Sequence, residues 1–431
     1  MAEKEFEGHN HMLKNLGIDI GAHDQLMQGL QPMFREVFLS QKNRPKAMSY
    51  FDFRMSEIHG CRIRELSEHK EKGGKVIGAF CLYVPEEIVL AAGGMMVGLC
   101  AGADIGGPEA EQYLPRNICP LIRSSLGMKL SRLCPYFELA DLVVGETTCD
   151  GKKKAWEIFQ DLIPLHVMHL PAMKGTKAQE LWLEEMIKFK EKVEEITGNE
   201  IDAAGLKEAI ARVNRRRAIL KRLNETRKIS PTPISGKDAL LVTQLGFSDD
   251  IEQFLEGAET LRQELEQRVR NSQGAIDAAM PRLMVSGCPM VLPNWKIHHI
   301  VETNGGAVVC EEACTGQRYF RDPVEESDGK LDNQLRVLSD RYLKLDCACF
   351  TPNDDRINNI IDLAQQYRVD GVIYNILQFC TTYAVEFYRV EKALKGIGVP
   401  VLRVETDYSQ EDIGPLTNRL EAFLEMIRKT H

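Results

Sequence analysis

Short apolar runs, each bounded by glycine, proline or charged residues, recur in two separate parts of the chain. Such runs, too short for buried helices, are typical of strands covered on both faces in a parallel sheet. We expect strands at residues 75–80, 95–99, 141–146 and 165–170 in the first part, and at 282–287, 306–309, 370–374 and 399–404 in the second. Helical patterns separate the strands, which predicts an α/β fold with parallel sheets.

Two other stretches show the helical period and few strand signals. Residues 1–72 contain an apolar stripe that includes Met27 and Phe38, and residues 175–280 alternate apolar positions such as Phe189 with charged ones. The pattern therefore predicts a helical N-terminal region (1–72), a first α/β domain (73–174), a helical connection (175–280) and a second α/β domain (281–431).

The two α/β parts resemble each other in the order of their strands and cysteines. A cysteine follows the first strand of each part, Cys81 and Cys288, and another follows the third, Cys149 and Cys380. Cys380 lies 231 residues after Cys149, and Val401 of the last strand lies 234 residues after Val167. The first pair is only 207 residues apart, so the second part needs an insertion between its matched strands. We expect two Rossmann-like domains related by pseudo-symmetry.

Charge and hydropathy exclude several classes of protein. The 431 residues carry a formal net charge of −9, and the basic runs are short, so general nucleic-acid binding is not expected. No apolar stretch is long enough to span a membrane, and residues 1–7 lack the apolar core of a signal peptide. We expect a cytoplasmic protein.

Twelve cysteines are the strongest chemical signal in the chain. Without a secretory signal, they are not expected to form a disulfide framework. Loops that follow parallel strands meet at one edge of a sheet, near helix N-termini whose N–H groups favour a thiolate. We expect six cysteines on such loops: Cys81, Cys119, Cys149, Cys288, Cys314 and Cys380. Cys61, Cys100 and Cys134 are interpreted as packing thiols.

The spacing of these cysteines argues against the commoner thiol sites. Structural zinc sites usually show two close pairs, and only Cys310 with Cys314 and Cys347 with Cys349 are close here. No C-x-x-C motif is present, which disfavours thioredoxin-like chemistry. Thiolates gathered from distant segments suit iron–sulfur ligation, although nucleophilic catalysis by one cysteine stays open.

Several segments resemble motifs of the 2-hydroxyacyl-CoA dehydratase (benzoyl-CoA reductase-like) superfamily. They are Phe80-Cys81-Leu82-Tyr83-Val84-Pro85-Glu86-Glu87-Ile88 followed by Ala91-Ala92-Gly93, then Thr148-Cys149-Asp150-Gly151-Lys152-Lys153-Lys154, Cys314-Thr315-Gly316-Gln317-Arg318, and Gln378-Phe379-Cys380. The resemblance covers the chain from about residue 45 to the end. It implies two Rossmann-like domains and a partner, an ATP-hydrolysing iron–sulfur reductase that delivers low-potential electrons.

The number of cysteines makes the chain similar to the double-cubane cluster proteins of this superfamily, which hold an [8Fe–9S] unit. Two cubanes joined by one sulfide leave six iron positions for thiolates, the number of the loop cysteines named above. The pseudo-symmetry suggests Cys81, Cys119 and Cys380 on one cubane and Cys149, Cys288 and Cys314 on the other. Cys347 and Cys349 are the expected substitutes if one of the six is not a ligand.

The resemblance favours an iron–sulfur reductase, active as a homodimer, that reduces a small molecule with electrons from its ATP-dependent partner. Proton donors beside the cluster are sought among Glu86, Glu87, Glu146, Lys152 and Glu386. Each also has a plain structural interpretation: Glu86 and Glu87 as helix-end carboxylates, Glu146 as a strand-end carboxylate, and Lys152 and Glu386 as solvated charges. Two alternatives stay open. One is a 2-hydroxyacyl-CoA dehydratase subunit with a single [4Fe–4S] cluster and a ketyl-radical mechanism, and the other is a non-catalytic electron carrier.

No phosphate-binding loop is present, so ATP is expected on the partner.

Overall fold

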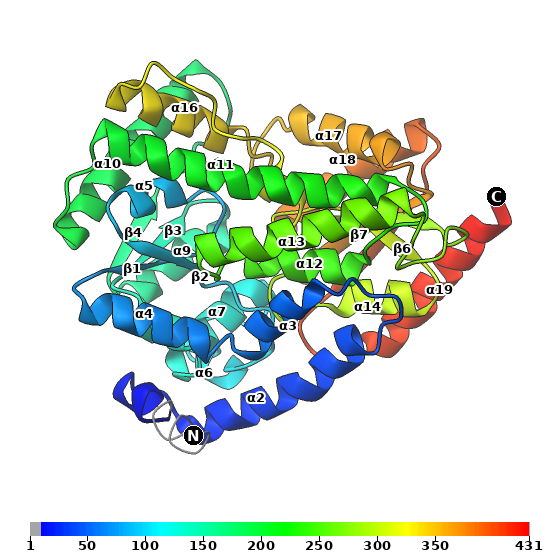
Figure 1. Ribbon diagram of the computed structural model, residues 1–431, viewed down its shortest axis with the longest axis horizontal. Coiled ribbons are helices and arrows are strands. Elements are labelled where there is room, and N and C mark those ends of the chain that lie inside the picture. The colour runs from blue at the N-terminus through cyan, green and yellow to red at the C-terminus, as the bar shows by residue number, and fades with distance from the viewer. Residues whose placement is uncertain (1–9, 431) are drawn as a thin grey trace.

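Two parallel four-stranded sheets form the centre of the protein (Figure 1). The computed structural model describes residues 10–430. The first sheet has the strand order β2-β1-β3-β4 and the second has the order β6-β5-β7-β8. The strands are β1 (Val76–Ala79), β2 (Met95–Gly98), β3 (Leu142–Glu146), β4 (Leu165–Met168), β5 (Arg282–Gly287), β6 (Ala307–Glu312), β7 (Gly371–Leu377) and β8 (Val401–Thr406). The equal order of the two sheets confirms the α/β class and the pseudo-symmetric halves.

The central strands are buried on both faces, as their continuous apolar sequences predict. Every residue of β1, β3 and β7 is buried. In the first sheet Ile77 pairs with Leu142, and in the second Val285 pairs with Ile373. Because these central strands are covered on both faces, reactive side chains of this part of the fold can reach a pocket only from the loops at the strand ends.

Helices cover both sheets and connect them. Around the first sheet lie α4 (Cys61–Glu71), α5 (Glu86–Ala91), α6 (Gly107–Ala110), α7 (Pro120–Leu130), α8 (Pro135–Leu139) and α9 (Asp150–Phe159). Around the second lie α14 (Lys296–Thr303), α15 (Gln317–Phe320), α17 (Asp354–Gln366), α18 (Thr381–Gly396) and α19 (Ile413–Thr430). Helix α16 (Leu331–Leu343) follows β6 in the sequence but packs with the core of the first sheet. The N-terminal region contains α2 (Ile20–Phe34), the π-helix η1 (Arg35–Leu39) and α3 (Met48–Ser56).

The connecting region contains α10 (Thr176–Thr197), α11 (Ala203–Glu225), the 3-10 helix η2 (Thr226–Lys228), α12 (Gly236–Leu245) and α13 (Ile251–Arg270). Aspartate side chains cap the N-termini of α11 and α13. Asp202 accepts a hydrogen bond from the Gly205 N–H at 2.7 Å, and Asp250 accepts from the N–H groups of Glu252 and Gln253. Helix α10 ends at Gly198, whose φ of 74° favours glycine.

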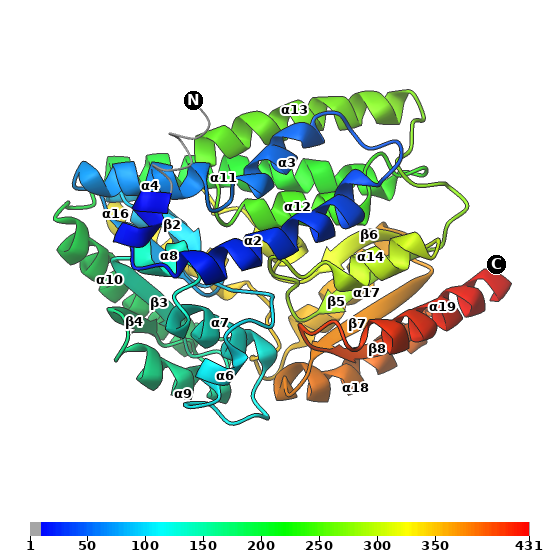
Figure 2. The ribbon, with the colours of Figure 1, turned by 90° about the horizontal axis from the view of Figure 1, so that it is seen from below.

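The connecting helices pack on both halves of the molecule. Helix α11 contacts α5 of the first half and α15 of the second, and α12 contacts β6. Figure 1 shows α11, α12 and α13 as one layer across the two sheets. Figure 2 shows α2 running along another side of the molecule, from the first half toward α14. The four residue ranges expected for the regions stay a prediction, because the packing joins them closely.

The longer connection of the second half lies between β6 and β7. Residues 313–370 occupy it, whereas residues 99–141 connect β2 to β3 in the first half. Its helix α16 packs against α10 and α11. Among the described residues, no helix is long and apolar enough to cross a bilayer.

Candidate metal centre

A pocket of about 820 Å³ lies between the two halves, at the carboxyl edges of both sheets. Loops that follow β1, β3, β5 and β7 all contribute to its walls, and so do Leu26 and Leu30 of α2. Ten cysteines line it: Cys81, Cys100, Cys119, Cys134, Cys149, Cys288, Cys314, Cys347, Cys349 and Cys380. All six cysteines singled out from the sequence therefore face one pocket.

One group of thiols surrounds Cys380. Hydrogen bonds from the Cys119 and Cys288 thiols lower the pKa of Cys380 to about 3. The Cys288 sulfur also accepts a hydrogen bond from the Leu377 N–H at 3.4 Å. Cys149 lies within electrostatic reach of both Cys380 and Cys119. We call Cys119, Cys149, Cys288 and Cys380 the first thiol group.

Three members of the first thiol group stand at helix N-termini. Cys119, Cys149 and Cys380 are the N-cap residues of α7, α9 and α18. The first N–H groups of a helix have no partner within the helix, and the helix dipole places positive charge there. A thiolate, or sulfur bound to a metal, is stabilised at such a position.

A second group of thiols brings together cysteines of both halves. Burial raises the pKa of Cys81, and the neighbouring Cys314 and Cys347 sulfurs raise it further. A hydrogen bond from Cys349 lowers the pKa of Cys347 to about 6. We call Cys81, Cys314, Cys347 and Cys349 the second thiol group.

This grouping differs from the division expected from pseudo-symmetry. Cys81 neighbours Cys314 and Cys347, and not Cys119 and Cys380 as expected. Cys347 and Cys349 belong to the loop between α16 and α17. This loop is part of the longer connection between β6 and β7, so pseudo-symmetry with the first half could not place it beside Cys81. Their signal in the sequence was the close C-x-C spacing, which favoured them only as substitutes.

The four remaining cysteines belong to neither thiol group. The Cys100 thiol donates to the Phe80 carbonyl at 2.9 Å, and Cys134 begins the short helix α8. Cys61 contacts the Glu57 carboxylate, and Cys310 is fully buried inside β6; neither lines the pocket. Both are packing thiols in this structure.

The expected proton donors fall into two sets. Glu146 at the end of β3 is fully buried and accepts hydrogen bonds from Thr148 at 3.1 Å and from Lys152. Burial disfavours the ammonium of Lys152, but Glu146 and the neighbouring Cys81 and Cys100 sulfurs raise its pKa well above the ordinary value. Lys152 lines the pocket as a cation.

The other carboxylates are committed to buried ion pairs. Glu86 lines the pocket but accepts from Arg216 at 3.1 Å. Glu87 is fully buried and pairs with Arg217 at 2.7 Å. Glu386 pairs with Arg356 and does not line the pocket. Their contacts favour a structural role.

The donor set of the pocket fits an iron–sulfur cluster. Within residues 10–430, no three His, Cys, Asp or Glu side chains converge closely enough to hold a single metal ion. Eight thiols in two groups on the walls of one large pocket instead match a cluster, whose ligands are spread over several irons. Thiolate ligands and donating N–H groups at helix N-termini suit such a centre.

Comparison with known proteins identifies the family of the chain. The model of the family "2-hydroxyglutaryl-CoA dehydratase, D-component" matches residues 81–427, the range that contains every strand except β1 and all ten pocket cysteines. The chain belongs to this family. The superfamily expected from the sequence motifs is thereby confirmed.

Individual relatives are enzyme subunits by name. An Escherichia coli (strain K12) protein with the provisional name dehydratase subunit YjiM is 39% identical, covering 86% of this chain and 96% of its own. The (R)-phenyllactyl-CoA dehydratase beta subunit of Clostridium sporogenes is 24% identical over 84% of this chain and 94% of its own. A benzoyl-CoA reductase subunit of Thauera aromatica is 19% identical over 82% and 91%. These relatives support an enzymatic role for the chain.

Proposed function

We propose that this protein is an iron–sulfur reductase that receives low-potential electrons from an ATP-hydrolysing iron–sulfur partner and reduces a small molecule in the pocket between its halves. The observation that carries the proposal is the division of the pocket cysteines into two thiol groups, each with at least three members. Two groups of three thiolates are what an [8Fe–9S] double cubane requires.

The six ligands that we propose are Cys119, Cys288 and Cys380 from the first thiol group, with Cys81, Cys314 and Cys347 from the second. The fourth member of each group, Cys149 in the first and Cys349 in the second, is the nearest alternative ligand. This set keeps five of the six cysteines expected from the sequence and replaces Cys149 by Cys347. The bound cluster supplies one-electron chemistry at low potential.

The protein's own groups prepare the pocket for reduction of a small molecule. Apolar side chains such as Phe247 and Leu292 line much of the wall and exclude water. The Lys152 ammonium, held by Glu146, lies where it can attract or protonate a substrate that gains negative charge. We propose Lys152 and Glu146 as the proton-handling pair, whereas Glu86 stabilises Arg216. A homodimer in the cytoplasm remains our proposal for the assembly.

The content of iron and acid-labile sulfide tests this proposal directly. Protein purified without oxygen is expected to hold about eight irons and nine sulfides per chain. About four of each would instead support a 2-hydroxyacyl-CoA dehydratase subunit with one [4Fe–4S] cluster, a function favoured by the names of the relatives. A full double cluster that accepts electrons from the partner but reduces no small oxidant would indicate an electron carrier.

Replacing Lys152 by methionine is expected to slow substrate reduction by about 100-fold, because the positioned ammonium is lost. Iron and sulfide content should stay unchanged, and the Lys152→Arg variant should recover part of the rate by retaining the charge. The measurement is the partner- and ATP-dependent rate, with Lys154→Met as the control, since Lys154 is exposed and pairs with Glu157 outside the pocket. Equal rates for Lys152→Met and Lys154→Met would contradict the assignment.

A further inference from the structure

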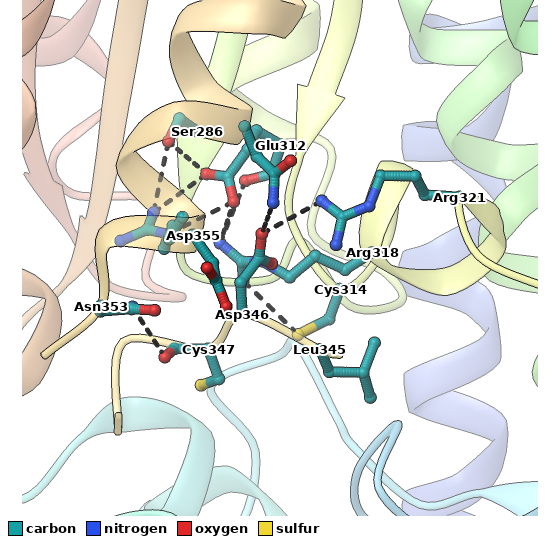
Figure 3. Close-up of polar contacts among 12 residues, drawn as sticks. Ser286, Glu312, Cys314, Arg318, Arg321, Leu345, Asp346, Cys347, Asn353 and Asp355 are labelled. Atoms are coloured by element: carbon teal, nitrogen blue, oxygen red, sulfur yellow. Dashed lines mark hydrogen bonds and ion pairs between the residues drawn. The ribbon is translucent and has the colours of Figure 1, made fainter. Parts of the chain in front are cut away.

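A buried arginine contacts the second thiol group. Arg318 of α15 is 1% exposed, and its Nη1 lies 3.8 Å from the Cys314 sulfur. The same Nη1 donates to the Tyr383 hydroxyl at 2.7 Å, which in turn lies 4.0 Å from the Cys347 sulfur. Figure 3 shows the Cys314 and Cys347 side chains on the same side of the polar network that contains Arg318.

Carboxylates fix the orientation of Arg318. Its Nη2 pairs with Glu312, and its Nε lies 3.2 Å from Asp346. Glu312 also accepts from Ser286 at 2.6 Å and from Arg356 at 3.0 Å. These partners, all buried, leave the guanidinium little freedom to turn away from the sulfur.

The network holds charges of both signs, so the position of each charge relative to the sulfurs decides its effect. Its cations are Arg318, Arg321 and Arg356, and its carboxylates are Glu312, Asp346, Glu386 and Asp322, the last paired with Arg321 at 3.0 Å. Arg318 is the member that hydrogen-bonds a pocket sulfur. Because electrostatic energy falls with distance, the Arg318 cation at 3.8 Å from the Cys314 sulfur affects that sulfur more than the charges that contact only other members of the network.

The first thiol group has a different environment. The Cys288 sulfur accepts from the Leu377 N–H, and the Cys380 sulfur contacts the Thr382 hydroxyl at 3.7 Å; both partners are neutral. Within residues 10–430, no arginine or lysine side chain is hydrogen-bonded to a sulfur of this group. The Lys152–Glu146 pair borders both groups through Cys149 and Cys81, so it does not distinguish them.

We propose that Arg318 is a positioning residue that orients Cys314 and makes the second thiol group the side of the centre that accepts the first electron. The inference rests on the proposed iron–sulfur function. One electron from a one-electron iron–sulfur donor adds one negative charge to the centre, with no bond made or broken. A buried cation beside Cys314 stabilises that charge more than the neutral contacts of the first group do.

Redox titration without oxygen, followed by electron paramagnetic resonance, tests the proposal on the intact protein. Arg318→Gln is expected to shift the midpoint of the first reduction to lower potential. Arg318→Lys should keep the midpoint closer to the wild-type value, since the charge remains. The matched control is Arg227→Gln, because Arg227 is also fully buried and paired with a carboxylate, Glu311, but lies outside the pocket.

Loss of a buried partner can unfold a protein, so a second variant keeps the test decisive. The double variant Arg318→Gln with Glu312→Gln removes one charge of each sign and leaves Arg356 paired with Glu386. A smaller downward shift is expected, because the Glu312 charge that is also removed acts in the opposite direction but from further away than the Arg318 cation. An unchanged midpoint in either folded variant, or an equal shift in Arg227→Gln, would overturn the role of Arg318.

The iron content separates this inference from the proposed function. Wild-type protein with about four irons would reject the double cluster, yet the midpoint of its single cluster would still report on Arg318. A full double cluster with a midpoint that ignores Arg318 would reject the inference alone.

Discussion

Replacing Cys288 by alanine is expected to remove about four irons per chain and to lower the partner-dependent reduction rate by more than about 100-fold. Replacing a residue that hydrogen-bonds a metal ligand already lowers metal affinity or activity by about 10- to 100-fold, and loss of the ligand itself should have a larger effect. Cys288 is 2% exposed, follows β5 and hydrogen-bonds the Cys380 sulfur. The measurements are iron and sulfide content and the rate with saturating partner and ATP.

Cys310→Ala is the matched control for this experiment. Cys310 is also a buried cysteine of the second sheet, but it lies inside β6 and does not line the pocket. It should keep its full iron content even if its stability falls slightly. Equal iron in the two variants would show that Cys288 is not a ligand and would remove one member of the first thiol group.

Replacing Glu87 by alanine is expected to lower the free energy of unfolding by about 3–5 kcal/mol, the usual effect of stranding one member of a buried ion pair. Glu87 is fully buried, pairs with Arg217 and accepts a hydrogen bond from the Tyr342 hydroxyl at 2.7 Å. Its loss leaves the Arg217 charge without its carboxylate between α5, α11 and α16. Denaturant unfolding of the anaerobic protein measures the change.

A surface pair provides the comparison. Glu266→Ala removes one partner of Arg262 on α13, where the Glu266 side chain is 42% exposed and Arg262 keeps Glu259. Solvent screening should limit the loss of stability to less than about 1 kcal/mol. A loss for Glu87→Ala as small as that for Glu266→Ala would contradict the structural role assigned to Glu87.

The sheet edges were predictable because local patterns define buried strands. Short apolar runs bounded by glycine, proline or charged residues identified β1, β3, β5 and β7, and the repeated order of these strands indicated two related halves. The carboxyl ends of parallel strands meet at one edge, so Cys81 and Cys288 could be assigned to a common site before any contact was known.

Which thiols are neighbours was not predictable in the same way. Matching the halves by pseudo-symmetry paired Cys81 with Cys119 and Cys380, but the longer connection between β6 and β7 brings Cys347 beside Cys81 instead. The insertion breaks the pseudo-symmetry of the two halves, and nothing local in residues 313–370 indicates which half its loop will approach.

The ion-pair partners of the buried carboxylates were likewise not predictable from the sequence. Glu86 and Glu87 stood at a helix start, where the helix dipole favours carboxylates, and Glu386 had the pattern of a solvated charge, yet each was a candidate proton donor. Their partners Arg216, Arg217 and Arg356 come from α11 and α17, far away in sequence, and these contacts commit the three carboxylates to ion pairs.

The sequence by itself determined the strands, the duplication, the six loop cysteines and the family, because each depends on residues close together along the chain or on motifs within one loop. Tertiary structure alone decided which thiols are neighbours, that α2 contributes to one wall of the pocket, and that Arg318 reaches Cys314 while Glu146 accepts a hydrogen bond from Lys152. The physical reason is that burial and electrostatic contact depend on distances between segments, and those distances follow from how the helical layer packs the two halves together.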